Sequence, residues 1–460
     1  MIPNYPDRAK HLVSIVRYEE PMESVKQAVN LSSGLKHLPA RAKVFIKPNI
    51  VFWTRSTPFP KWGVITTSRV VEDMVKLLKD AGVSSITIGE GTVLMDPKDR
   101  ETIPHAFHSL GYEFLSKRYG VNCLNLFERP FRKLDLGDGI SLRFNTDILE
   151  SDFVINLPVL KTHAQTVVSL GIKNLKGTID LPSRKYCHTD DPEKDLHFRV
   201  AKLADPMPPM FTLLDGIYTL ERGPSFDGRV KRSNLLIASS DVLSADIIGA
   251  AVLGYSPEEV PHLVHAAKNR NRPLDLTDIQ LAGEPVSEVT TPHKYSFPYN
   301  KEDTLPLPMA RMKIQGLSYR KYDLSLCTYC SYINGALLAA VARAWDGTPW
   351  DDVEILTGKT MKPTPGMKKT ILLGKCMYQA NKDNPEIQEM IPIKGCPPRQ
   401  KDIIIAMHRV GIQIDPSIIE QMDLLPGSFL KRYEDKPGFD ESFFSIESAS
   451  DGLSRRGAPR

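Results

Sequence analysis

The order of apolar and polar residues predicts alternating strands and helices over residues 1–285. Runs of β-branched and aliphatic residues, as expected of strands, occupy residues 11–17, 43–46, 85–88, 121–126, 153–157, 211–214 and 235–239. Residues 66–82 show apolar positions at helical spacing between two of these runs, from a threonine cap to Gly82. Further helices are expected over residues 22–33, 101–119 and 242–253. The alternation predicts an α/β domain with a mainly parallel sheet.

The pattern changes after residue 285. Residues 286–325 mix Pro, Thr, Lys and Tyr without a clear period, so we expect a linker. Residues 326–433 hold four of the six cysteines, and we expect them to form a small α+β, cysteine-rich metal-cluster domain. Residues 434–460 are rich in Ser, Asp and Gly and are expected to be a disordered tail.

Composition limits the function classes. The apolar content of 41% and charged content of 25% are typical of a globular protein, and the net charge of +4 argues against a nucleic-acid binder. The sequence contains no run of about eighteen apolar residues, so we expect no membrane span. The N-terminus has no apolar signal core, and we expect a cytoplasmic protein whose cysteines are free thiols or metal ligands.

A basic stretch follows the strand at 153–157. Lys161, Thr162 and His163 come directly after it, and Lys173 and Asn174 follow one apolar turn later. In an open α/β sheet the ligand crevice lies at the carboxyl ends of the strands, so this stretch suits an anionic carboxylate or phosphate. A solvated basic loop is the alternative interpretation.

Other strands end in polar residues that parallel pairing would bring to the same edge. We predict that the catalytic residues are His163, Lys161 and Glu90. The predicted substrate-binding residues are Lys47, Asn49, Lys173, Asn174 and Asp215. Cys187, His188 and His197 lie in a polar segment that could bind a metal, but the lysines and arginine around them favour an exposed loop.

The remaining cysteines suggest a metal centre. Cys327 and Cys330 have the C-x-x-C spacing that lets two thiolates ligate one centre, and Cys376 and Cys396 follow. Cys396 precedes a proline, as in iron–sulfur sites where the Cys-Pro step leads the chain away from the cluster. We predict a [4Fe–4S] cluster on these four cysteines. Structural zinc and unligated thiols are the alternatives.

The chain resembles the prokaryotic family known as domain of unknown function 362. The motifs that carry the resemblance are Lys47-Pro48-Asn49, Gly89-Glu90-Gly91, Asn156-Leu157-Pro158 with Lys161-Thr162-His163, the segment 171–177, Leu214-Asp215-Gly216, and Asp241 through Asp246. The resemblance covers about residues 10–285 and implies a fold and a site, but no substrate. Members often carry a ferredoxin-like iron–sulfur module after this domain. Here the cysteines are more widely spaced, and Gly395-Cys396-Pro397-Pro398 looks more like the cluster-ligating end of the small iron–sulfur subunit of respiratory complexes.

Together these features predict a redox enzyme or electron-transfer protein that acts on an anionic small molecule and exchanges electrons with a redox protein partner. Two alternatives stay open: a non-redox enzyme on a carboxylate or phosphate ester with structural zinc, and a scaffold that delivers a cluster.

Overall fold

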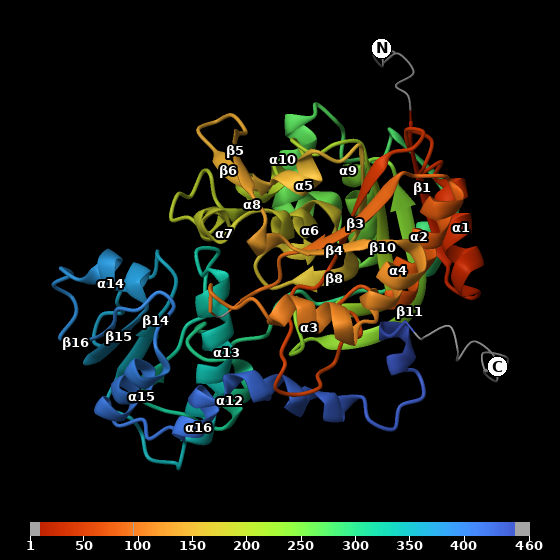
Figure 1. Ribbon diagram of the computed structural model, residues 1–460. Coiled ribbons are helices and arrows are strands. Elements are labelled where there is room, and N and C mark those ends of the chain that lie inside the picture. The colour runs from red at the N-terminus through yellow and green to blue at the C-terminus, as the bar shows by residue number, and fades with distance from the viewer. Residues whose placement is uncertain (1–9, 95, 447–460) are drawn as a thin grey trace.

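The computed structural model describes residues 10–94 and 96–446 (Figure 1). Most of them form an α/β domain around a ten-stranded sheet with the order β12-β1-β11-β10-β7-β2-β3-β4, while β8 pairs with β10 and β9. The strands are β1 (His11–Arg17), β2 (Lys43–Pro48), β3 (Ser85–Glu90), β4 (Asn122–Asn125), β7 (Phe153–Leu157), β8 (Val159–His163), β9 (Val167–Ser169), β10 (Met210–Glu221), β11 (Arg229–Ser239) and β12 (Ile279–Gly283).

The sheet is mostly parallel, which confirms the α/β prediction for this domain. The central neighbours β10, β7, β2, β3 and β4 all pair in parallel. β11 pairs antiparallel with both β1 and β10, and β9 pairs antiparallel with β8. Central strands such as β2 are buried on both faces, and this explains their continuous apolar runs.

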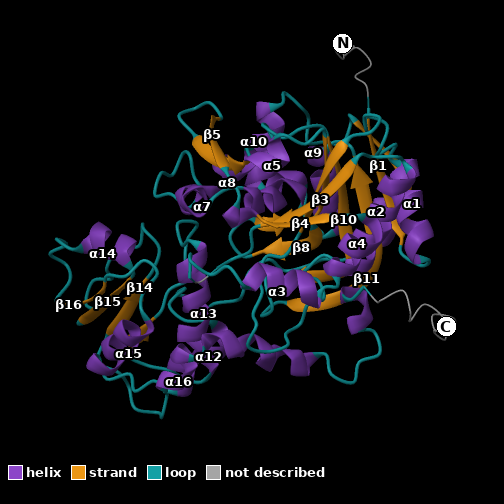
Figure 2. Ribbon diagram, in the orientation of Figure 1, coloured by secondary structure: helices purple, strands orange, loops and turns teal. Residues whose placement is uncertain are grey.

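Helices cover both faces of the sheet (Figure 2). The helices of the first face are α1 (Pro21–Leu31), α2 (Ser68–Asp80), α3 (Thr102–Ser109) and α4 (Tyr112–Tyr119). The helices of the second face are α6 (Gly171–Asn174), α8 (Leu196–Ala201), α9 (Val242–Val252) and α10 (Pro261–Asn269). The single helix expected over residues 101–119 is two, because Gly111 between them has a φ of 76°, which a continuing helix cannot contain.

Shorter elements complete the domain. They are the hairpin β5 (Phe131–Asp135) and β6 (Ser141–Asn145), and the helices α5 (Thr146–Leu149), α7 (Leu181–Cys187) and α11 (Val286–Val289). The expected exposed loop over residues 181–200 is wrong: α7 and α8 lie there, and Cys187, His188 and His197 are buried. None of the helices in the described ranges combines the length and apolarity needed to cross a bilayer.

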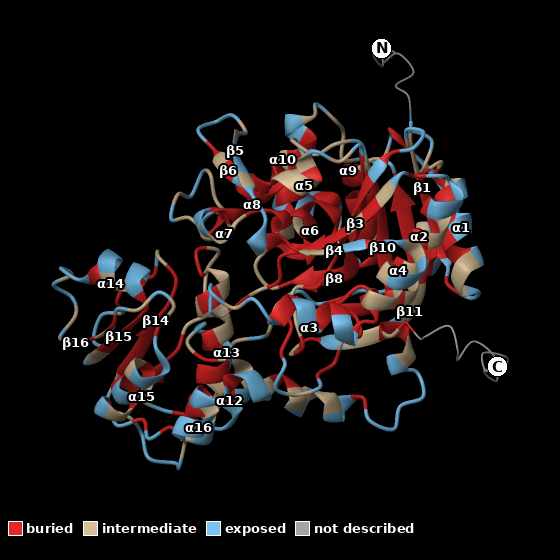
Figure 3. Ribbon diagram, viewed as in Figure 1, coloured by how far each residue is buried: buried red, intermediate tan, exposed pale blue. Residues whose placement is uncertain are grey.

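The second domain has a four-stranded, all-parallel sheet in the order β13-β14-β15-β16. Its strands are β13 (Leu317–Ser318), β14 (Val353–Leu356), β15 (Lys369–Leu373) and β16 (Glu389–Ile393), and its helices are α12 (Leu307–Arg311), α13 (Thr328–Arg343), α14 (Lys375–Asn381), α15 (Gln400–Arg409) and α16 (Pro416–Glu420). Strands and helices alternate, so this domain is α/β and not α+β. It also has its own buried core (Figure 3).

Two expected boundaries change. Residues 286–325 are not only a linker, because they contain α11, α12 and β13, the first strand of the second sheet. The expected disordered tail is ordered over residues 434–446, where Phe443 and Phe444 pack into the aromatic core of the first domain with Trp62 and Tyr218. The remainder of that tail, residues 447–460, lies outside the described residues. We call residues 422–446 the C-terminal strap, because they return from the second domain to the first (Figure 1).

Candidate functional site

Two predicted site residues end neighbouring parallel strands and neutralise each other. The Lys47 ammonium at the end of β2 lies 2.7 Å from a carboxylate oxygen of Glu90 at the end of β3, and both side chains are at most 3% exposed. Glu90 also accepts the backbone N–H of Ile50. Burial lowers the pKa of Lys47, while Glu90 opposes that effect. Because the two charges neutralise each other, neither the predicted substrate-binding residue Lys47 nor the predicted catalytic residue Glu90 offers a net charge to a ligand.

Lys161 is a buried structural donor. It lies on β8 and not in a solvated loop after a strand, and its side chain is inaccessible. Its Nζ donates to Asn49 Oδ1 and to the carbonyl of Val64, each at 2.7 Å. Burial lowers the pKa of Lys161 to about 7. A neutral amine has two N–H groups, and the two acceptors match them.

Three asparagines continue this network into α6. Asn49 Nδ2 donates to Asn174 Oδ1 at 2.9 Å, and Asn174 Nδ2 donates to Asn156 Oδ1 at 2.8 Å. Asn156 then donates to the carbonyl of Gly171 at 3.0 Å. The predicted ligand-binding amides of Asn49 and Asn174 thus hold the short helix α6 against the sheet.

The carboxylate that fixes the start of α6 is not among the site residues predicted from the sequence. Asp246 on α9 accepts the backbone N–H groups of Gly171 and Ile172 at 2.6 and 2.8 Å. Burial raises the pKa of Asp246 to about 7, although both hydrogen bonds act against that shift. Its place in the first turns of a helix after a strand was visible in the sequence, but its partners were not.

Lys173 and His163 are the predicted site residues that remain available to a ligand. The Lys173 ammonium on α6 makes no hydrogen bond or ion pair with the described residues, and its side chain is partly exposed. His163 Nδ1 accepts the backbone N–H of Gln165 at 3.1 Å, which leaves Nε2 to carry the hydrogen of the neutral ring. Burial and the charge of Lys173 hold the pKa of His163 well below its usual value. Burial and the charge of Lys176 do the same to Lys173.

Lys176, Arg184 and His188 enlarge this basic cluster. Lys176 Nζ lies 2.6 Å from His188 Nε2, and His188 Nδ1 donates to the carbonyl of Leu324 at 3.0 Å. The Arg184 guanidinium donates to three backbone carbonyls. Burial lowers the pKa of Lys176 to about 8 and that of Arg184 to about 10. None of the three is among the catalytic or substrate-binding residues predicted from the sequence. His188 was considered only as a metal ligand, and the polarity around Arg184 and His188 favoured an exposed loop there.

Asp215 was predicted to bind substrate, but its carboxylate lies at the start of α2. Its carboxylate accepts the backbone N–H of Thr67 at 2.7 Å, at the first turn of α2, and that of Ile217 at 3.2 Å. Burial raises the pKa of Asp215 to about 6, and Arg232, not one of the site lysines, is the charged group that opposes this shift. Asp215 thus fixes the start of a helix on the first face.

The four predicted ligand cysteines gather at one edge of the second sheet. Cys327 caps α13 and Cys330 lies in its first turn, while Cys376 follows β15 and Cys396 follows β16. Because these strands are parallel, the segments after them share an edge. The Cys327 and Cys330 thiols share a hydrogen bond that lowers the pKa of Cys327 and raises that of Cys330, and both other thiols are near enough to raise it further.

The backbone around these thiols is close-packed. A Cβ atom built on Gly374, which has a φ of 92°, would lie 3.4 Å from the Cys330 sulfur.

Among the described residues, no three or more His, Cys, Asp or Glu side chains form a group that could hold a metal ion. Cys123 and Cys187 lie apart, and all six cysteines are free thiols.

The cysteine edge faces the basic cluster across the junction of the domains. Lys185 on α7 donates to the Cys396 sulfur at 3.7 Å and lies 4.7 Å from the ring centre of Tyr329. Gln165 Nε2 donates to the carbonyl of Leu326 at 2.9 Å, directly before Cys327. A small pocket lined by Arg184, Lys185, Cys327 and Tyr329 lies between the domains. The two sites that the sequence predicted separately are therefore neighbours.

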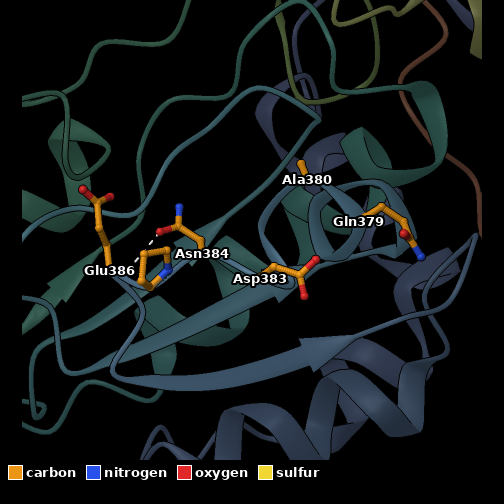
Figure 4. Close-up of a pocket in the computed structure, with 6 residues that line it drawn as sticks. Gln379, Ala380, Asp383, Asn384 and Glu386 are labelled. Carbon is orange, nitrogen blue, oxygen red and sulfur yellow. Dashed lines mark hydrogen bonds between the residues drawn. The ribbon is translucent and has the colours of Figure 1, made fainter.

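Another hollow lies at the end of α14 in the second domain. It is open to solvent and is lined by Gln379, Asp383, Asn384 and Glu386, which Figure 4 shows spread along the surface. The backbone N–H of Glu386 donates to Asn384 Oδ1 at 3.0 Å. This hollow contains neither cysteine nor lysine, so the basic cluster and the cysteine edge stay the candidate site.

A family model and a known protein both match the sequence of the first domain. Residues 44–251 match the family model described as a domain of unknown function, DUF362. A thylakoid-associated protein of Synechocystis sp. is 26% identical over 235 residues, which cover 50% of this chain and 67% of that protein. The match confirms the resemblance for residues 44–251, and it ends before the cysteines.

Two solved structures are also similar in part. The lactate racemase apoprotein from Thermoanaerobacterium thermosaccharolyticum aligns with a TM-score of 0.35 and 18% identity, over 54% of this chain and 58% of that one. A protein from Thermotoga maritima aligns with a TM-score of 0.25 and 15% identity, over 55% and 60% of the two chains. This chain spans less than two thirds of either structure.

Proposed function

We propose that this protein is a cytoplasmic iron–sulfur protein that transfers electrons to or from a small anion. In this proposal Cys327, Cys330, Cys376 and Cys396 hold a [4Fe–4S] cluster. The anion binds at the basic cluster of the first domain. The observation that carries the proposal is the contact between the two sites: Lys185 of the first domain donates to the sulfur of Cys396.

Cysteine thiols are the donors that such a cluster takes. Four thiols come from the starts of two helices and from the loop after β16, and a four-cysteine set is the usual ligand set of a four-iron cluster. When bound, the cluster supplies or accepts one electron at a time. Lys185 donates a hydrogen bond to one ligand sulfur, and hydrogen bonds to the sulfurs together with nearby charge tune the potential of such centres.

The first domain supplies unbalanced positive charge next to these thiols. Lys47 is neutralised by Glu90, whereas Lys173, Lys176 and Arg184 form no ion pair with any described carboxylate. A buried cation without a counter-ion is costly, so a bound anion would stabilise this arrangement. Lys173 would contact the anion directly, and the Nε2–H of the neutral His163 ring would donate a hydrogen bond to it.

The cluster can be tested on anaerobically purified protein. We expect about four iron and about four sulfide per chain, with visible absorption that dithionite bleaches. The Cys330→Ala variant should lose both. Stoichiometric zinc without iron would contradict the proposal and favour the structural-zinc alternative.

The anion site can be tested separately with acetate and phosphate as probes. A lysine contact to either oxyanion is charge-assisted and contributes about 1.5–3 kcal/mol, so Lys173→Met should weaken calorimetric binding by roughly one to two orders of magnitude. The surface variant Lys36→Met is the control, because Lys36 is exposed on the first domain. Equal affinities of the parent and both variants would show that Lys173 does not bind the anion.

A further inference from the structure

The outward-facing half of the cysteine edge is surrounded by lysines. Cys376 and Cys396 are exposed, whereas Cys327 and Cys330 are only partly exposed. Lys375 precedes Cys376, and its backbone N–H donates to the carbonyl of Gly395, which precedes Cys396. The two exposed cysteines therefore belong to one surface.

Four lysines from four segments of the chain form this surface, which we call the lysine rim. They are Lys185 on α7, Lys359 after β14, Lys375 at the start of α14 and Lys394 after β16. Lys185 and Lys359 are partly buried and act across the junction: Lys185 contacts the Cys396 sulfur, and Lys359 donates to the carbonyl of His188. Lys375 and Lys394 are exposed, and Lys394 lies 4.4 Å from the ring centre of Tyr378.

The lysine rim carries positive charge that no ion pair with a described carboxylate neutralises. None of its four lysines forms an ion pair with a described carboxylate, whereas several other cations that follow β15 and β16 do. The paired groups include Lys382 with Asp383, Arg399 with Asp402 and Arg409 with Glu389. Unpaired positive charge therefore lies beside the exposed cysteines.

We propose that the lysine rim is the docking surface for a small acidic electron-carrier protein. This inference rests on the proposed cluster, since the two exposed cysteines would be its ligands nearest to the partner. Complementary charge accelerates the encounter of two proteins and fixes their orientation, and the effect weakens as salt screens it. Electrons would then enter at the exposed cysteines and reach the anion on the covered side, so carrier and substrate would not compete for one surface.

The test uses the full chain and a double charge reversal, Lys375→Glu with Lys394→Glu. The probe is a reduced, negatively charged [2Fe–2S] ferredoxin, and stopped-flow absorbance follows the one-electron reduction of the cluster. At low ionic strength we expect the second-order rate constant to fall by about tenfold or more, and the difference to shrink at high salt. The matched control is Lys36→Glu with Lys79→Glu, which changes the net charge equally on the first domain and should leave the rate nearly unchanged.

Reduced methyl viologen, a small cation, distinguishes a loss of protein docking from damage to the cluster. It should reduce the cluster of the double variant at least as fast as that of the parent, and iron content should be equal in both. Equal ferredoxin rates for parent and rim variant, or an equal loss in the control, would overturn the docking surface. A parent protein without any iron–sulfur cluster would instead overturn the proposed function on which the inference rests.

Discussion

Lys161 on β8 and Lys173 on α6 are expected to respond in opposite ways to the same substitution. In Lys161→Met, Asn49 Oδ1 and the carbonyl of Val64 each lose a donor at 2.7 Å in a buried site. An orphaned buried acceptor costs about 1–3 kcal/mol, so with two of them we expect the free energy of unfolding to fall by about 2–6 kcal/mol. Lys173→Met removes a cation that has no described partner, so we expect a change within about 0.5 kcal/mol or a gain.

Urea unfolding measures the difference. The fluorescence of the buried Trp53 and Trp62 reports on the first domain, while Trp345 and Trp350 report on the second, so far-UV circular dichroism should be recorded in parallel. Midpoints are the quantity to compare, because a two-domain chain need not unfold in one step. A Lys161→Met midpoint equal to that of the parent, or an equal loss in Lys173→Met, would refute the assignment of structural and ligand-binding roles.

The same lysine should also make stability depend on pH. The pKa of Lys161 is about 7 in the folded protein and 10.5 without burial. Between these values the unfolded chain holds a proton that the folded one has released, so this contribution to stability rises with pH from about 7 to 10.5 and is absent below 7. Lys161→Met should flatten the rise. A slope that persists unchanged in the variant would contradict the lowered pKa.

Three further outcomes follow from single contacts. The pKa of Asp246 is raised to about 7, so its contribution should make stability fall as pH rises from about 4 to 7, and Asp246→Asn should flatten that fall in urea midpoints. Iron content should drop to near zero in Cys330→Ala and stay at the parental value in Cys123→Ala, because Cys123 lies apart from the cysteine edge; equal iron in both would refute this assignment. Phe443→Ala should lower the free energy of unfolding by about 3–4 kcal/mol, and an unchanged midpoint would show that the C-terminal strap contributes little.

The sequence predicted the elements well where one residue pattern decides the structure. The alternation at His11–Arg17 gives a strand with those bounds, and Asp241 caps α9 by accepting the N–H of Ser244 at 2.7 Å. The clustering at the strand ends also follows from parallel pairing, since Lys47 and Glu90 meet there. These features depend on neighbours in the chain or on one rule of topology.

The partners of the polar side chains could not be predicted in the same way. Whether Lys161 meets a ligand or Asn49 depends on a contact across 112 positions, which no local pattern encodes. The polarity of residues 181–200 favoured an exposed loop, because hydrogen bonds that bury groups such as His188 are invisible in composition. In the strap, Phe443 is buried despite the Ser- and Asp-rich sequence around it.

The C-terminal strap makes the second domain an insertion within the first. The aromatic core around Trp62 and Tyr218 is completed by Tyr433, Phe439, Phe443 and Phe444, which are among the last described residues. During synthesis the first domain would emerge with this apolar surface uncovered, and it would stay uncovered until the second domain had been made. A prematurely terminated chain would thus expose this apolar surface to chaperones and proteases. A chain in which this core is complete therefore also contains the whole second domain, with Cys327, Cys330, Cys376 and Cys396.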